Sequence, residues 1–288
     1  MLTLRDALTS NRFVITAEIC PPKGTDTTAF IKNAQLLKNR IAAANVTDNQ
    51  RAVMRLSSLA CSVLLLKEGI DPVFQMTCRD RNRIALQSDI LGAWTLGISN
   101  ILALSGDHVS FGDHREAKPV FDLDSVQLVQ TISKLNNARN MNDTSLNSGT
   151  DFLIGAVVAP EANPLEPEMI KFEKKVLAGA RFFQTQAFYD MENFKRFYEY
   201  AKRFDVKILA GILLLKSAKM AHFLNKNVPG VTVPTNIIEE LESAPDQLEK
   251  GIEIAARQIR ELKTFCDGAH IMAIGQEENV PKIIESAN

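Results

Sequence analysis

The sequence has little net charge and no long apolar run. Its 33 Lys and Arg residues nearly balance 34 Asp and Glu residues, and the formal net charge at pH 7 is −1. This balance gives no reason to expect nucleic acid or an anionic membrane as a partner. No apolar run approaches the roughly 20 residues of a membrane span, and the first residues do not resemble a secretion signal. We therefore expect a cytoplasmic protein without a membrane span.

Cysteine and histidine are scarce and scattered. The four cysteines form neither a Cys-x-x-Cys motif nor the dense pattern of a disulfide scaffold, so we expect reduced thiols. The one loose group of metal-ligating residue types lies in a polar stretch that reads as a surface loop, and we expect no metal site there. The cysteines are Cys20, Cys61, Cys78 and Cys266, and the loose group is Asp107, His108, Asp113 and His114.

The sequence also lacks a Gly-x-Gly-x-x-Gly turn after an early strand, which argues against a dinucleotide-binding open sheet. It has instead a regular alternation of short apolar runs with amphipathic stretches, as in repeated βαβ units. We predict a single-domain (β/α)8 TIM barrel over residues 1–288, with a doubly wound open sheet as the alternative. The expected strands are Phe13–Ala17, Ala42–Val46, Asp71–Met76, Asn100–Ala103, Phe152–Val158, Phe182–Thr185, Lys207–Ile212 and Ala269–Ala273.

The amphipathic stretches between these strands predict helices, because several carry apolar residues at i, i+3, i+4 and i+7. Two segments break the rhythm, His108–Phe121 and Lys216–Glu242, and the polar stretch Asn136–Thr150 is expected to be a mobile surface connection. The expected helices are Thr28–Arg40, Ala52–Glu68, Arg81–Leu96, Asp124–Asn136, Glu168–Leu177, Met191–Arg203 and Leu248–Phe265.

Polar residues are concentrated where the expected strands end, which is where barrel enzymes carry their chemistry. Glu18 leaves an apolar strand and enters a cleft beside Pro21 and Pro22, where loss of water favours the protonated acid and suits general-acid catalysis. Asp107 follows Gly106, which lets the backbone approach a ligand closely. From position alone, Glu18 has an ion pair with a Lys or Arg as its alternative role, and Asp107 has a turn cap.

Three segments resemble motifs of the methylenetetrahydrofolate reductase family. Glu18-Ile19-Cys20-Pro21-Pro22 is similar to the family's Glu-Phe-x-Pro-Pro segment, and Leu102-Ala103-Leu104-Ser105-Gly106-Asp107 is similar to Leu-Ala-Leu-Arg-Gly-Asp. The third comprises Lys175–Ala180 and Gln184–Asp190, which resemble Lys-Val-x-Ala-Gly-Ala and Thr-Gln-x-x-Phe-Asp. The resemblance extends from about Phe13 to Ile284.

This resemblance implies FAD-dependent reduction of 5,10-methylenetetrahydrofolate to 5-methyltetrahydrofolate at the barrel mouth. It implies that Glu18 is the general acid, that Asp107 contacts flavin and pterin, and that Gln186 contacts folate and the nicotinamide of the donor. It also implies folate contacts at Leu224 and Gln276. The residues implied for FAD binding are Thr47, Gln75, Leu104, Ser105, Gly106, Asp107, Ala156 or Val157, Glu168 for a ribose hydroxyl, and Lys175 for the pyrophosphate.

The sequence departs from the family pattern at positions that bear on these roles. Ser105 stands where many relatives have Arg, Gln75 where some have His, and Gln276 where relatives have Arg or Trp. Arg79 and Arg81 either add contacts at the third strand or pair with Asp80 at the surface. The expected cofactor and folate contacts are therefore altered from those of the relatives.

The electron donor stays open between NAD(P)H and a partner protein that carries an iron–sulfur centre or a flavin. The ending His270–Gly275 resembles that of folate-using anaerobes and acetogens, whose donor can be a partner protein, and we expect a homo- or hetero-oligomer. Two other functions compete with reduction. One is a catalytically idle barrel that binds folate or scaffolds a methyl-transfer complex. The other is an aldolase or corrinoid methyltransferase, against which the lack of a lysine inside an apolar strand argues.

Overall fold

Eight parallel strands close into a barrel in the computed structural model, which describes residues 3–10, 12–228 and 230–288. Each strand pairs with the next along the chain, and β8 pairs with β1 to close the ring. The predicted (β/α)8 barrel is confirmed. That residues 1–288 form a single domain stays a prediction, and residues 1, 2, 11 and 229 of that range lie outside the described residues. The strands are β1 Val14–Ile19, β2 Ala43–Val46, β3 Pro72–Thr77, β4 Asn100–Leu104, β5 Leu153–Val158, β6 Phe182–Ala187, β7 Lys207–Leu213 and β8 Gly268–Met272.

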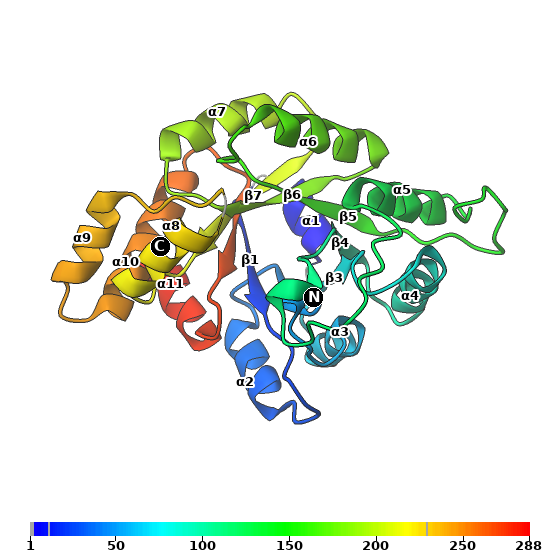
Figure 1. The fold of residues 1–288 in the computed structure, drawn as a ribbon, viewed down its shortest axis with the longest axis horizontal. Helices are drawn as coiled ribbons and strands as arrows, with labels where there is room; N and C mark the ends of the chain where they lie inside the picture. Colours follow the sequence, from blue (N-terminus) through cyan, green and yellow to red (C-terminus); the bar gives the residue numbers. More distant parts are fainter. Residues whose placement is uncertain (1–2, 11, 229) are drawn as a thin grey trace.

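Helices surround the strands in Figure 1, and a helix is present within each of the seven stretches where one was expected. Their apolar stripes face the barrel: Ile252, Ala255, Ala256 and Ile259 of α10 are all buried. Side-chain caps fix where several of them begin, as at Asp124 and Gln127, which form a capping box before α5. The helices are α2 Thr28–Leu37, α3 Ser58–Lys67, α4 Arg83–Thr95, α5 Ser125–Asn136, α6 Glu166–Ala178, α7 Met191–Ala201 and α10 Gln247–Leu262.

Four further helices were not expected from the sequence: α1 Leu4–Thr9, α8 Ala218–Asn227, α9 Thr235–Ser243 and α11 Val280–Ser286. Helix α1 covers the amino-terminal end of the barrel, where its apolar residues pack against Val14, Val73 and Phe182. The Leu4 N–H also donates to the Asp71 carboxylate over 2.7 Å. Helix α8 lies within the segment Lys216–Glu242, α9 begins in it and ends at Ser243, and α9 packs beside α10 (Figure 1).

Two predicted boundaries were wrong in ways that affect the site. The helix expected from Ala52 begins only at Ser58, because Arg51 and Ala52 have left-handed backbone angles (φ 57° and 56°) that no α-helix accepts. Strand β1 continues to Ile19, because Glu18 and Ile19 still pair with Asn45 and Val46 of β2. Glu18 therefore belongs to the strand itself, whose backbone holds it.

The polar connection after α5 extends away from the barrel in Figure 1. The Asn136 side chain closes its base by accepting hydrogen bonds from the Thr150 hydroxyl (2.7 Å) and the Phe152 N–H (2.9 Å). Whether this segment is mobile stays a prediction.

Candidate functional site

A cavity of about 380 Å³ opens at the carboxyl ends of the strands. Its size is within the range of small-molecule and cofactor sites, and its place is where barrel enzymes carry out catalysis. It brings together most of the residues that the sequence singled out. Those that line it are Glu18, Gln75, Leu104, Ser105, Gly106, Asp107, Val157, Glu168, Lys175 and Gln186.

Four of the expected binding residues are not among the cavity-lining residues of the described chain. Thr47 is buried beside Cys20, to whose sulfur its hydroxyl donates over 3.5 Å. Ala156 faces the helices, and strand alternation leaves Val157 to line the cavity. Leu224 packs in the apolar cluster of α8 and α9, and the Gln276 side chain accepts a hydrogen bond from the Asn279 amide. Their binding roles stay predictions.

Glu18 is a largely buried carboxylate, with a side chain 14% exposed, that faces nitrogen donors from three other elements. The Gln50 amide donates to Oε2 over 3.3 Å, and the Gln75 amide donates to Oε1 over 3.4 Å. The His270 Nε2 atom lies 3.8 Å from Oε1. The ion pair with a Lys or Arg that the sequence left open is not formed among the described residues, and both oxygens face neutral amides and an imidazole.

Below Glu18, a buried polar network crosses the interior of the barrel. The His270 Nδ1 atom lies 2.9 Å from the Thr16 hydroxyl and 3.3 Å from the Gln184 amide nitrogen. The side-chain amides of Gln184 and Asn45 bond to each other in both directions, over 2.8 and 3.0 Å. No role for these four residues was predicted from the sequence. The sequence did carry a signal for them, since all four are polar residues inside expected apolar strands. Buried polar groups must find hydrogen-bond partners, so such residues indicate an internal network.

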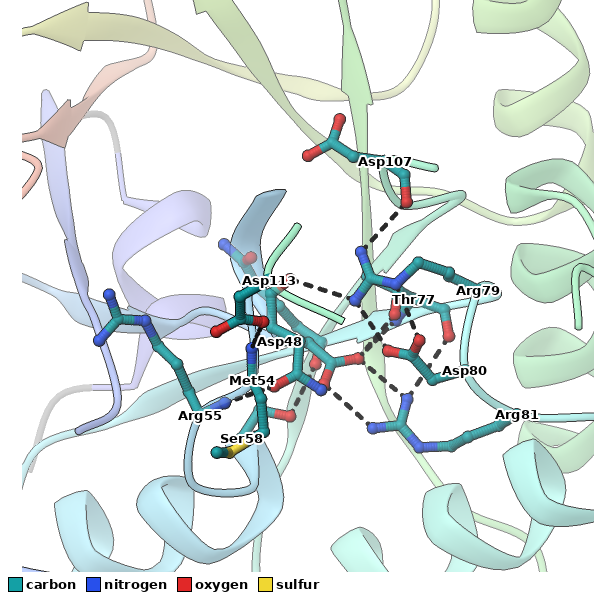
Figure 2. Close-up of polar contacts among 12 residues, drawn as sticks. Asp48, Met54, Arg55, Ser58, Thr77, Arg79, Asp80, Arg81, Asp107 and Asp113 are labelled. Carbon is teal, nitrogen blue, oxygen red and sulfur yellow. Dashed lines mark hydrogen bonds and ion pairs between the residues drawn. The ribbon is translucent and has the colours of Figure 1, made fainter. Parts of the chain in front are cut away.

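The ends of β2 and β3 are joined by the carboxylate of Asp48, which is 3% exposed. Arg81 donates to both of its oxygens, over 2.9 and 3.0 Å, and the Thr77 hydroxyl and N–H both donate to Oδ2 (Figure 2). The Asp48 carboxylate thus accepts four hydrogen bonds, three at Oδ2 and one at Oδ1. Asp48 therefore holds the ends of β2 and β3 together at the mouth of the barrel, and its carboxylate has little hydrogen-bonding capacity left for a ligand.

Arg79 is buried and lines the cavity, and it pairs with Asp80 there and not at the surface as the sequence allowed. Its guanidinium donates to the Asp80 carboxylate (2.7 and 2.8 Å), to the Asn49 carbonyl (3.1 Å) and to the Asp107 carbonyl (3.2 Å). Figure 2 shows it reaching from β3 to the main chain of Asp107. Arg79 therefore ties together the loops that follow β2 and β4.

Gly106 lets the loop after β4 lie close to β3. Its φ of 86° is left-handed, and a Cβ atom there would lie 3.0 Å from Cβ of Thr77 and 3.3 Å from Cβ of Arg79. Glycine meets both demands, since it has no Cβ and accepts positive φ. The neighbouring Asp107 side chain lines the cavity and is exposed, and its carboxylate accepts no hydrogen bond from any residue in the described ranges. The turn-cap role that the sequence left open is therefore not seen.

Helix α6 supplies the opposite wall of the cavity. The ammonium group of Lys175, which is 6% exposed, donates to the Val157 carbonyl over 2.6 Å, and burial lowers the pKa of this lysine. Glu168 partly opposes that shift and accepts a hydrogen bond from the Ala159 N–H over 3.0 Å. Lys171 and Arg51 add exposed cations to the lining. The cavity thus has the carboxylates of Glu18 and Asp107 at the β1 and β4 ends, while its α6 wall carries Lys171 and Lys175 beside Glu168.

The loops after β2 and β4 touch at the edge of the mouth. The 3-10 turns η1 Gln50–Ala52 and η2 Val109–Phe111 meet so closely that a Cβ on Gly112 would lie 1.8 Å from the Ala52 carbonyl oxygen. The Asp113 carboxylate accepts from the Met54 N–H over 3.1 Å (Figure 2). Its hydrogen bond to His114 is the main reason that the pKa of Asp113 falls to about 2.

The loose histidine group does not converge. His108 bonds to Ser110 and His114 to Asp113. Within the described ranges, no three His, Cys, Asp or Glu side chains gather closely enough to hold a metal ion. None of the helices in those ranges combines the length and apolar character needed to cross a bilayer.

Comparison with known proteins agrees with this geometry. A family model for methylenetetrahydrofolate reductase matches residues 3–288. A 5,10-methylenetetrahydrofolate reductase of Pectobacterium carotovorum subsp. carotovorum is 26% identical over 251 residues, which cover 82% of this chain and 76% of that protein. Methylenetetrahydrofolate reductase 1 of Schizosaccharomyces pombe is 25% identical over 75% of this chain, but the match covers only 35% of that longer protein.

Solved structures support the fold. An uncharacterized protein from Clostridium thermocellum, described as binding two copies of 5-methyl-5,6,7,8-tetrahydrofolic acid, superposes with a TM-score of 0.64 at 20% identity, over 98% of this chain and 96% of that one. A 2,3-dimethylmalate lyase superposes with a TM-score of 0.55 at 10% identity, over 99% of this chain and 86% of that one. These identities support the barrel alone. Because the family model spans nearly all of the chain, the protein belongs to the methylenetetrahydrofolate reductase family.

Proposed function

We propose that this protein reduces 5,10-methylenetetrahydrofolate to 5-methyltetrahydrofolate with FAD, and that Glu18 is the general acid. The observation that carries the proposal is the position of Glu18, which lines the mouth cavity and is largely withdrawn from water. Opening the five-membered ring of the folate to an iminium requires a proton at the ring nitrogen that leaves the methylene carbon. Glu18 in its protonated form delivers that proton and becomes a carboxylate.

Asp107 and Gln186 are the other residues proposed to contact the folate. Both line the cavity with exposed side chains. The unpartnered Asp107 carboxylate suits the guanidine-like edge of a pterin, which offers two parallel N–H donors. The Gln186 amide offers both a donor and an acceptor, so it can orient the ring system against Glu18.

The residues along α6 fit FAD, although no FAD is part of the structure. Lys175 uses one of its three N–H donors on Val157, which leaves donors for a pyrophosphate oxygen, and Glu168 retains an oxygen for a ribose hydroxyl. Gly106 lets a planar ring approach the backbone after β4. When bound, the flavin supplies the hydride that the methylene carbon accepts. NAD(P)H and a redox partner protein remain the two proposed sources of electrons, and a homo- or hetero-oligomer is proposed as the assembly.

A second candidate is a folate-binding barrel without flavin chemistry. Its support is Glu18 and Asp107, two separated carboxylates among those that line the cavity, each of which can receive a pterin, together with Ser105 in the place of the arginine that many relatives have. The similar protein from Clostridium thermocellum is described as binding two copies of 5-methyltetrahydrofolic acid. The two candidates differ in whether the second half of the cavity holds FAD or a second folate.

Absorbance spectroscopy and calorimetry on the purified chain test the proposal. We expect a yellow protein, or one that takes up FAD, whose flavin band bleaches when 5-methyltetrahydrofolate is added without oxygen. We also expect one folate to bind per chain. A protein that does not bind FAD and binds two folates per chain would establish the second candidate. Assays with NADH, NADPH and reduced dyes then identify the donor, since dye activity without nicotinamide activity indicates a partner protein.

A further inference from the structure

His270 lies directly behind Glu18 and has no role in the proposed function as stated so far. It is 2% exposed, lines the cavity, and is held by β8 in register with Thr16 of β1. The two neighbours of its Nδ1 atom, Thr16 and Gln184, fix the plane of the imidazole ring. That plane directs Nε2 toward Oε1 of Glu18.

The neighbours of Nδ1 indicate which ring nitrogen carries the proton. As the structure places it, the Gln184 amide nitrogen faces Nδ1 with hydrogen atoms and no lone pair. Flipping the Gln184 and Asn45 amides together would keep their reciprocal bonds and turn the Gln184 oxygen toward Nδ1, so these bonds alone do not fix the orientation, which the histidine resonances described below test. In the orientation that the structure has, Nδ1 is the acceptor, the Thr16 hydroxyl can donate to the same lone pair, and the ring carries its proton on Nε2, the atom that faces Glu18.

We propose that His270 is a positioning residue whose Nε2–H hydrogen-bonds to Glu18 as that acid loses its proton to the folate. The inference rests on the proposed function. The 3.8 Å separation is too long for a hydrogen bond in the free protein, but catalytic hydrogen bonds are often long before substrate binds and shorten in the complex. A donor aimed at the charge that develops on Glu18 stabilises the transition state more than the ground state. The proton that moves in this step is the one that leaves Glu18, and His270 keeps its Nε2–H.

Two amide substitutions of His270 test its two ring nitrogens one at a time. In His270→Gln the amide nitrogen takes the place of Nε2 and keeps a donor toward Glu18, whereas in His270→Asn the amide group takes the place of Nδ1 and keeps only the contacts with Thr16 and Gln184. We expect the single-turnover rate of folate reduction to stay within about threefold of wild type in His270→Gln and to fall roughly ten- to a hundredfold in His270→Asn. Dissociation constants for 5-methyltetrahydrofolate and FAD should change little in either variant.

The reverse order of rates would mean that His270 serves only the internal network, and an equal loss in both would mean that the ring itself carries the proton. Either result overturns the inference while leaving the proposed function intact. If the wild-type protein shows no folate reduction, the proposed function itself is wrong.

Nuclear magnetic resonance gives a second test that needs neither activity nor a folded variant. With 15N-labelled histidine, only four residues contribute to the spectrum. We expect one of the four to remain in the Nε2–H form at neutral pH and to shift when 5-methyltetrahydrofolate is added. If no histidine shows this form, or if the one that responds to folate is protonated on Nδ1, the inference is wrong.

Discussion

Arg81 and Asp48 are joined by two parallel hydrogen bonds of 2.9 and 3.0 Å across the ends of β2 and β3. Asp48 is also the acceptor for the N–H and hydroxyl of Thr77. One carboxylate thus fixes the direction in which two neighbouring strand ends leave the barrel. This position matters for function because Gln75 and Thr77 on β3 and Gln50 on the β2 loop line the same cavity as Glu18.

Replacing Asp48 tests that role. We expect Asp48→Ala to lower the free energy of unfolding by about 3 kcal/mol, because it removes the acceptor of the Thr77 N–H and of two N–H groups of the largely buried Arg81, which keeps its Nε pairing with Asp89. Asp48→Asn keeps one acceptor and should lose less. Urea titrations followed by circular dichroism measure both values. Equal stability of Asp48→Ala and wild type would show that water replaces the carboxylate at no cost.

Glu18→Gln tests the acid of the proposed mechanism. The amide cannot give up a proton as a carboxylic acid does, so we expect folate reduction to fall about 10²- to 10⁴-fold while FAD remains bound and is reduced by its donor at the wild-type rate. Stopped-flow spectroscopy separates the two half-reactions. If the folate half-reaction of Glu18→Gln kept a near wild-type rate, another group would be the acid.

The pH dependence of FAD binding follows from Lys175. Burial lowers its pKa in the free protein, and an anionic pyrophosphate favours the charged ammonium. FAD affinity should therefore fall as the pH rises through this lowered pKa, at a lower pH than for an ordinary lysine, whose pKa is 10.5. Lys175→Met should bind FAD more weakly and lose this alkaline decline. The measurement is fluorescence titration of FAD across the alkaline range, and a persistent decline in Lys175→Met would assign it to another group.

Gly106→Ala tests the close approach of the β4 loop to β3. The added Cβ would lie 3.0 Å from Cβ of Thr77, and alanine resists the φ of 86°. We expect a loss of roughly 1–3 kcal/mol in stability and weaker ligand binding at the mouth. Gly24→Ala is the matched control, since a Cβ there meets nothing within 4 Å. Similar melting curves for the two variants would contradict the role given to Gly106.

Thiol labelling checks the state of the cysteines. Burial raises the pKa of Cys61 to about 11 and the pKa values of Cys78 and Cys266 to about 12, and the reactive form of cysteine is the thiolate. Cys20 is the only one of the four that is partly exposed, although burial raises its pKa as well. We expect one slowly reacting thiol in the native protein, absent from Cys20→Ser, and four in denaturant without reductant. Fewer than four in denaturant would indicate a disulfide.

The alternation of apolar runs and amphipathic stretches was sufficient to predict the barrel, because burial on both faces of a parallel strand and on one face of each helix leaves a periodic trace in the sequence. The short helices α1, α8, α9 and α11 were not predicted in that way. They contribute three buried residues each in segments of six to ten residues, too few to establish a period. The left-handed residues Arg51 and Ala52 were not predicted either, because neither is a glycine that would mark such a turn.

The sequence by itself determined the order of the elements, the barrel, and the strand-end residues Glu18, Asp107 and Gln186 that the family motifs identify. Only the tertiary structure decided which of the strand-end residues share a cavity and how each is held there. Arg79 and Asp48 proved to line it as buried residues bonded to neighbouring strand ends and loops, and His270, Gln184 and Asn45 proved to form one network beside Glu18. The physical reason is closure of the barrel, which brings β1, β2, β6 and β8 to one axis although their residues are far apart in the chain, so no local pattern records their contacts.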